Sequence, residues 1–184
     1  MNLDVSDYKQ LIDIDNIFKF QKEKKDFQIY FLENYNNKNI YKIIGIIPCN
    51  YKKCITYLSS PEIRESLSKG AMKCNIIKKI NDKEWFEKII FESKLNLDPL
   101  YSIEKVIVED NLIYTFSSDP EGYTDSFIGD KRDNDFTCFK CYEIEQTKCL
   151  ITVVLTFDEF EMSQDVMVNG TVDFLDRLRF ALLN

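Results

Sequence analysis

The chain has 184 residues, of which 45% are hydrophobic and 14% aromatic, so it can form one domain, residues 1–184, with a sizeable core. It contains no histidine, which excludes Ser-His-Asp and Cys-His catalysis and every histidine-containing metal site. The formal net charge of -7 argues against a nucleic acid partner, because phosphate binding needs a basic surface.

No targeting or membrane-spanning segment is predicted. The first residues lack the charged-then-apolar pattern of a signal peptide, and no apolar stretch approaches the ~20 residues that cross a bilayer. We therefore expect a soluble, cytoplasmic protein. Its oligomeric state does not follow from the sequence.

The six cysteines stand at positions 49, 54, 74, 138, 141 and 149. Cys138 and Cys141 form a C-x-x-C motif inside a predicted strand. Residues i and i+3 of a strand point to opposite faces, so these two thiols cannot share a metal ion. We expect small buried or half-buried thiols, and neither a metal nor a cofactor.

The first third of the chain alternates helix and strand patterns. Residues 5–25 have apolar side chains at helical spacing and predict a helix. Residues 27–32 and 40–47 predict a hairpin with an Asn-rich turn. Residues 50–68 predict a second helix, which Pro61 kinks or restarts.

After Gly70 the pattern changes to successive strands. They are expected at 72–80, 85–93, 103–109, 112–117, 136–144 and 149–157, with a long polar loop at 119–135. The chain ends with a predicted helix over 163–183, with Ser163 as its N-cap. Its expected apolar stripe consists of Met167, Thr171, Phe174, Leu178 and Leu182.

The last strand indicates which face of the sheet is buried, because only one of its two alternating sets is wholly apolar. That set is Ile151, Val153, Leu155 and Phe157. On the preceding strands we expect the inward sets to be Leu112, Tyr114 and Phe116, and Phe136, Cys138, Lys140, Tyr142 and Ile144.

A lysine among inward side chains is costly unless it is paired. Three explanations of Lys140 remain open. It has a carboxylate partner, it meets the polar head of a ligand, or the strand is shifted by one residue, which would turn every side chain to the other face.

The order of elements and several local patterns resemble the START domain, the lipid-transfer domain of StAR-related proteins, over nearly the whole chain. Residues 41–48 resemble the family's early strand, and residues 61–64 (Pro-Glu-Ile-Arg) resemble the end of the helix that follows it. The connection at Pro99 and the run Met167-Val168-Asn169 also have counterparts. Ile103-Glu104-Lys105 stands where the family has an arginine-aspartate pair.

This resemblance implies an α+β helix-grip fold, in which a curved antiparallel sheet grips a long C-terminal helix over an internal apolar cavity. It implies binding of one phospholipid, sterol or sphingolipid and its transfer between membranes during transient membrane contact. The loop 119–135, with Tyr123, Phe127 and Ile128, is a candidate gate or an ordinary polar loop. The predicted ligand-binding residues are Tyr114, Phe116, Lys140, Tyr142, Ile151, Val153, Leu155, Phe157, Met167, Thr171, Phe174 and Leu178.

Two other functions remain open. A helix-grip module with a filled core could bind a protein partner, and the volume of the interior separates this case from a ligand binder. A cavity enzyme of the same fold, such as a cyclase or hydrolase, would have to use carboxylates such as Glu143 or Asp158. The absence of histidine favours a binder that is not an enzyme. The sequence does not identify the lipid.

Overall fold

The computed structural model describes residues 5–36, 38–69, 72–91, 100–124, 127, 129–131, 136–157 and 164–183. These residues form one ten-stranded sheet in the order β1-β2-β3-β10-β9-β7-β6-β5-β4, with β8 paired in parallel to β6. All other neighbouring strands are antiparallel.

The strands are β1 (Lys19–Lys24), β2 (Phe27–Tyr35), β3 (Lys38–Ile47), β4 (Met72–Asn81), β5 (Glu84–Phe91), β6 (Leu100–Val108), β7 (Leu112–Ser117), β8 (Asp130–Lys131), β9 (Phe136–Glu145) and β10 (Lys148–Phe157). The helices are α1 (Val5–Gln10), the 3₁₀ turn η1 (Leu11–Asp13), α2 (Tyr51–Ser59), α3 (Pro61–Ser68) and α4 (Gln164–Leu183). Among the described residues, no helix is both long and apolar enough to cross a membrane.

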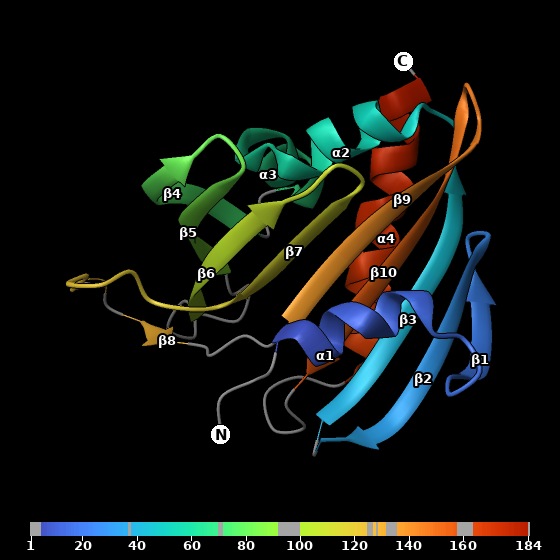
Figure 1. Ribbon diagram of the computed structural model, residues 1–184, viewed down its shortest axis with the longest axis horizontal. Coiled ribbons are helices and arrows are strands. Elements are labelled where there is room, and N and C mark those ends of the chain that lie inside the picture. The colour runs from blue at the N-terminus through green and yellow to red at the C-terminus, as the bar shows by residue number, and fades with distance from the viewer. Residues whose placement is uncertain are drawn as a thin grey trace.

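The sheet is covered on both sides (Figure 1). The face that packs against α4, here called the inner face, contributes most of the larger apolar cluster, together with residues of α2, α3 and α4. The opposite, outer face packs against α1 and η1 and forms a second cluster. The expected α+β helix-grip arrangement, a curved antiparallel sheet against a long C-terminal helix, is confirmed.

The prediction of one helix over residues 5–25 is wrong beyond Asp13. Residues 19–24 form the edge strand β1, which pairs with β2 through a turn where Lys25 and Asp26 have positive φ. This segment has a single apolar residue, Phe20, which is too few to distinguish the helical period from the strand period. Pairing with the hairpin that follows therefore decides its structure.

Pro61 restarts the helix, as expected. The Ser60 side chain accepts a hydrogen bond from the Ile63 N–H at 3.2 Å, and Pro61 occupies the first turn of α3. A proline costs little there because its missing N–H would have had no partner within the helix.

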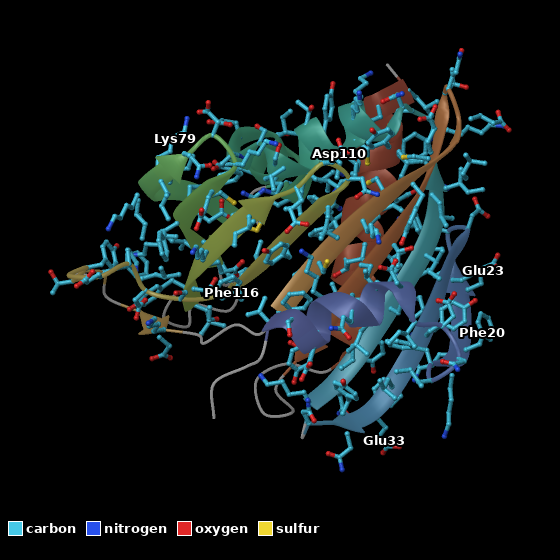
Figure 2. The ribbon with its side chains drawn as sticks, in the orientation of Figure 1. Phe20, Glu23, Glu33, Lys79, Asp110 and Phe116 are labelled. Atoms are coloured by element: carbon cyan, nitrogen blue, oxygen red, sulfur yellow. The ribbon has the colours of Figure 1, made fainter. Side chains whose placement is uncertain are left out.

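Both edges of the open sheet carry lysines and irregular pairing. Figure 2 shows Phe20 and Glu23 at the β1 edge and Lys79 at the β4 edge. The pairing of β1 with β2 shifts between Phe20 and Lys22, and the pairing of β4 with β5 shifts twice. The edge lysines are Lys19, Lys22 and Lys24 on β1, and Lys73, Lys78 and Lys79 on β4.

Gly45 on β3 makes room for the fully buried Phe27 ring. A Cβ atom added to Gly45 would overlap two atoms of that ring. We expect Gly45→Ala to lower the free energy of unfolding by about 1–3 kcal/mol, as overpacking does elsewhere. The measurement is the midpoint of urea unfolding.

The matched control is Gly170→Ala in α4, where an added Cβ meets nothing within 4 Å. Because alanine favours a helix interior over glycine, this variant should gain about 0.5–1 kcal/mol. A loss of stability at position 170 equal to that at position 45 would contradict the packing explanation.

Candidate functional site

The interior between the inner face and α4 is apolar. Ile151, Val153 and Leu155 on β10 belong to the same buried cluster as α4, which confirms that they face inward. Phe157 pairs with Asn39 at the end of β10, and its side chain lies outside the described part of the structure. Whether these residues contact a ligand stays a prediction.

The buried stripe of α4 is displaced from the predicted one. Leu178 and Leu182 are buried, as expected, whereas Met167 and Phe174 are half-buried at the flank of the cluster. The Thr171 hydroxyl donates a hydrogen bond to the Met167 carbonyl of its own helix, at 3.0 Å. The fully buried positions are Val168, Val172, Leu175, Leu178 and Leu182. These side chains are all aliphatic, so burying them leaves no hydroxyl without a partner.

The prediction that Tyr114, Phe116, Lys140 and Tyr142 face inward is wrong. Strand pairing sets Ile151 opposite Cys141 and Val153 opposite Phe139, so these residues of β9 are the inward ones. The alternate set therefore lies on the outer face. Leu112, Phe136 and Cys138 pack there with α1, and Tyr114 and Phe116 pack beside them. The β9 register is shifted by one residue from the expected one.

The inner face also holds a buried polar cluster that the sequence analysis did not assign. Arg64 of α3 donates two hydrogen bonds to Glu87 of β5, at 2.6 and 2.5 Å. The Trp85 indole N–H donates to the same carboxylate at 3.0 Å. Burial alone would lower the pKa of Arg64, but the charge and hydrogen bonds of Glu87 raise it, so this guanidinium stays charged.

A second carboxylate completes this cluster. Glu104 of β6 pairs directly with Glu87 across the sheet, and Ser102 donates a hydrogen bond to it at 2.9 Å. Both glutamates are almost completely buried. Within the part of the chain that the structure describes, the buried Nε atom of Arg64 has no hydrogen-bond partner. The cluster thus has two carboxylates to one guanidinium, with an unused donor beside an apolar interior.

Such an arrangement suits a molecule that has an apolar body and a polar head. Apolar side chains of the sheet and α4 can contact a hydrocarbon, and the polar cluster can hydrogen-bond a polar head. Part of this cluster could be found from the sequence. Arg64 lies in a stretch that resembles a START pattern, and Glu104 lies where START domains have an arginine-aspartate pair. The contact of Glu87 with Arg64 depends on how α3 packs on β5, and its contact with Glu104 depends on the β5–β6 register. The sequence pattern shows neither.

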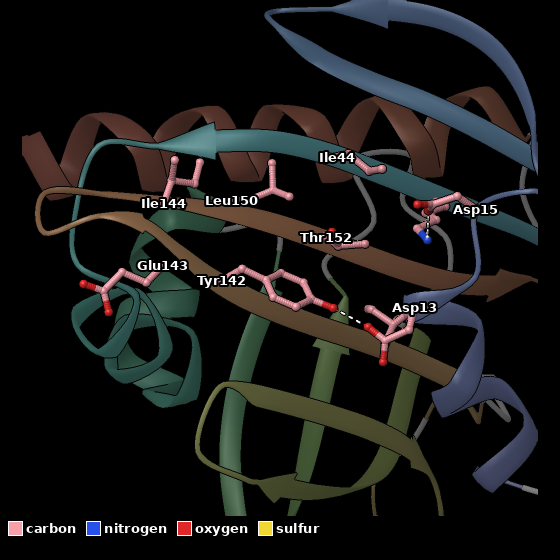
Figure 3. A pocket seen from close by; sticks show the side chains of 10 residues that line it. Asp13, Asp15, Ile44, Tyr142, Glu143, Ile144, Leu150 and Thr152 are labelled. Atoms are coloured by element: carbon pink, nitrogen blue, oxygen red, sulfur yellow. Dashed lines mark hydrogen bonds and ion pairs between the residues drawn. The ribbon is translucent and has the colours of Figure 1, made fainter.

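A shallow cavity of about 440 Å³ lies on the outer face beside η1 (Figure 3). Lys42, which is buried, reaches across it to the Asp15 carboxylate at 2.6 Å and the Ile14 carbonyl at 2.9 Å. Lys140 lies 2.7 Å from both oxygens of Asp13, and the Tyr142 hydroxyl donates to the same carboxylate.

These contacts tie η1 to the sheet and resolve the question of Lys140. It has a carboxylate partner, and its strand also has the shifted register. Partial burial would raise the pKa of Asp13, but hydrogen bonds from Lys140 and Tyr142 and the Lys140 charge lower it overall. The candidate catalytic carboxylate Glu143 is exposed at this cavity, and Asp158 lies outside the described residues.

Comparison with known proteins agrees with this geometry. No family model and no curated protein matches the chain. Human StAR-related lipid transfer protein 5 superimposes with a TM-score of 0.76 at 15% identity, over 97% of this chain and 92% of that chain. Human STARD10 gives a TM-score of 0.77 at 11% identity, over 100% and 80%. The Zhui aromatase/cyclase of Streptomyces gives 0.60 at 6% identity, over 79% and 94%.

The chain therefore has the helix-grip fold of START domains, as its sequence pattern implied. At these identities the likeness concerns the fold. It covers nearly the whole chain in the StAR-related structures, and about four fifths of it in the cyclase.

We expect Arg64→Met to lower the free energy of unfolding by about 3–5 kcal/mol, because it removes the guanidinium that donates two hydrogen bonds to the buried Glu87 carboxylate. The double variant Arg64→Met/Glu87→Gln should recover much of this loss. The control, Lys79→Met, breaks an exposed pair with Asp82 and should cost at most about 1 kcal/mol. Equal losses in both single variants, by urea unfolding, would contradict the assignment.

Asp13→Asn should lower stability at neutral pH by up to about 1 kcal/mol. Because the folded pKa of Asp13 lies below its ordinary value of 3.8, its contribution is complete above that value and disappears as pH falls through the folded pKa. Wild type and variant should therefore converge in thermal melts under strongly acidic conditions. Glu143→Gln, an exposed change at the same cavity, is the control, and a gap that persists at low pH would contradict the prediction.

Proposed function

We propose that residues 1–184 act as one lipid-binding domain, which holds a single lipid between the inner face and α4 and transfers it between membranes. The observation that carries this proposal is an apolar interior with a buried polar cluster that includes an unused donor, Arg64 Nε. The START fold supports it, because one of the matched structures is named as a StAR-related lipid transfer protein.

The proposed ligand contacts are the inward side chains of the sheet and the half-buried side chains of α4. Ile151, Val153 and Leu155 line one side, and Met167 and Phe174 line the other. Hydrocarbon moved from a bilayer to this interior exchanges one apolar surrounding for another, so transfer needs little net free energy. Transfer then requires only a conformational change that opens the interior to the membrane.

We propose that α4 opens, rather than the loop 119–135. Phe127 of that loop lies on the outer face, where the Lys88 ammonium is 4.0 Å from its ring centre and Tyr101 packs against its edge. In contrast, α4 is tied to the β1–β2 turn by ion pairs of Lys25, whose side chain is 42% exposed. Lys25 lies 3.0 Å from Asp173, which is also partly exposed, and 3.0 Å from the largely buried Asp176. The exposed pair with Asp173 costs little to break.

The charge of the polar cluster favours a neutral head group. Glu87 already occupies two N–H groups of Arg64, and Glu104 places a second carboxylate beside Glu87. A phosphate would be repelled there, whereas a hydroxyl or amide could donate to Glu104 and accept from Arg64 Nε. A sterol or a ceramide-like sphingolipid therefore suits the interior better than an anionic phospholipid.

A second candidate is a helix-grip module without a ligand. It is favoured by the complete burial of side chains such as Val153, Val172 and Leu175, which leaves no solvent contact in this part of the core. A cavity enzyme receives support only from the fold of the cyclase. We propose a non-enzymatic role.

The test uses the full chain. Purified protein is analysed by native mass spectrometry for bound lipid, and then assayed for transfer of labelled cholesterol, ceramide, phosphatidylcholine and phosphatidylserine between vesicles. We expect transfer of cholesterol or ceramide. Failure to bind or transfer any of the four classes would overturn the proposal in favour of the filled core.

The matched variants are Phe174→Trp and Phe180→Trp on the same helix. Phe174 is half-buried against the inner cluster, whereas Phe180 is 58% exposed. Extra volume at position 174 should reduce transfer by about 5- to 140-fold, since overpacking costs 1–3 kcal/mol and every 1.4 kcal/mol is a factor of ten. The Phe180 variant should transfer lipid like the wild type.

A further inference from the structure

Four of the six cysteines meet beneath α2. Cys49, Cys54, Cys141 and Cys149 are at most 5% exposed, and none of them forms a disulfide. The sulfur atoms of Cys49, Cys54 and Cys149 all lie within 4.8 Å of one another. Cys141 lies beside Cys149 on the inner face and is buried in the same cluster, although its sulfur atom does not lie within 4.8 Å of all three others.

The fold explains why two of these thiols come from the sheet. Cys149 pairs with Glu143, and Cys141 pairs with Ile151. The two cysteines are therefore diagonal neighbours on adjacent strands and share the inner face. The two cysteines of the C-x-x-C motif lie on opposite faces of the sheet, because Cys141 faces inward and Cys138 lies in the outer-face cluster.

The other two thiols come from the start of α2. Ile47 pairs with Cys149, and Cys49 follows Ile47 by two residues. Asn50 caps α2 through a hydrogen bond from the Lys52 N–H, at 2.8 Å. Cys49 thus precedes the cap and Cys54 lies on the next turn, the two positions whose side chains meet at a helix start. An apolar pair is common there, but here two further thiols converge on it from the sheet.

We propose that Cys49, Cys54, Cys141 and Cys149 bind one zinc ion in a tetrahedral site of four thiolates. Zinc–sulfur bonds of about 2.3 Å place the four sulfur atoms about 3.8 Å apart. Three of the sulfur atoms already lie within 4.8 Å of one another, and the Cys141 side chain, on the strand next to Cys149, would move toward them to complete the site. Binding releases the four thiol protons to solvent and changes no oxidation state.

The ligand set and its enclosure select zinc. Thiolates prefer zinc, copper(I) or iron–sulfur clusters. In an iron–sulfur cluster, bridging sulfides and several iron atoms separate the cysteine ligands, which does not suit three sulfur atoms within 4.8 Å. Four buried ligands without an open position are typical of structural zinc. Lys53, whose charge acts on Cys49, offsets part of the negative charge of such a site.

The site would fasten α2 to the β9–β10 end of the inner face, independently of any lipid. In Figure 1, α2 lies at the end of the sheet where β9 turns into β10, and the two strands are close to this helix. The proposal therefore concerns stability of the fold and does not rest on the proposed function.

The first experiment uses the wild-type chain, purified under reducing conditions and reconstituted with zinc. We expect one zinc per chain by mass spectrometry of metals, and a higher melting temperature than after removal of zinc by a chelator. Cobalt(II) in place of zinc should give the intense visible bands and the thiolate charge-transfer absorption of a tetrahedral site. A chain without stoichiometric zinc and without this cobalt spectrum would overturn the proposal.

Variants then identify the ligands. Cys54→Ser and Cys149→Ser should weaken zinc binding by more than about tenfold, in competition with a chromophoric chelator. Cys138→Ser, which changes an equally buried thiol three residues from Cys141, and Cys74→Ser should keep both zinc and the cobalt spectrum. Equal loss in the Cys138 variant, or disulfides among the four cysteines after purification in reductant, would count against the site. The cobalt spectrum of the wild-type chain tests the site without any variant. The proposal can therefore be decided even if a variant fails to fold.

Discussion

The central strands of this sheet are buried on both faces, and the other features of the molecule follow from that constraint. The sheet is covered by α4 on one side and by α1 and η1 on the other. Every residue of β10 from Ile151 to Thr156 is buried. Successive side chains of one strand therefore serve different purposes. Inward ones enclose the interior, and outward ones hold the N-terminal segment, where Lys42 and Lys140 anchor η1 through carboxylates.

The helices α2 and α3 each contribute to a different group of polar side chains in the interior. They are consecutive and separated by Ser60, yet α2 contributes Cys54 to the thiol group while α3 contributes Arg64 to the carboxylate cluster. Each helix is thus connected to the sheet by directional contacts as well as by apolar packing. Such contacts fix the position of a helix more specifically than hydrophobic burial, which has no preferred direction.

Local sequence patterns predicted most helices and strands. The remaining features depended on pairing between segments that are distant in the sequence. The Asn-rich turn, Pro61 and the alternating strands after Gly70 marked their elements, because caps and turns are properties of neighbouring residues. Alternation could not assign the faces of β7 and β9, since Tyr114 and Ile113 are both apolar enough for burial. The inward face of β10 was predictable, because only one of its two alternating sets is wholly apolar. The Arg64–Glu87 pair and the four thiols depend on strand register, which local pattern does not fix.

The lysine-rich edges have a consequence for how this protein meets copies of itself. An open sheet presents unpaired N–H and C=O groups along β1 and β4, and another chain could extend it there. The charges on Lys22 and Lys78 and the nearby shifts in pairing oppose such growth. Loss of these charges would therefore weaken the protection of both edges against pairing with a second copy of the chain.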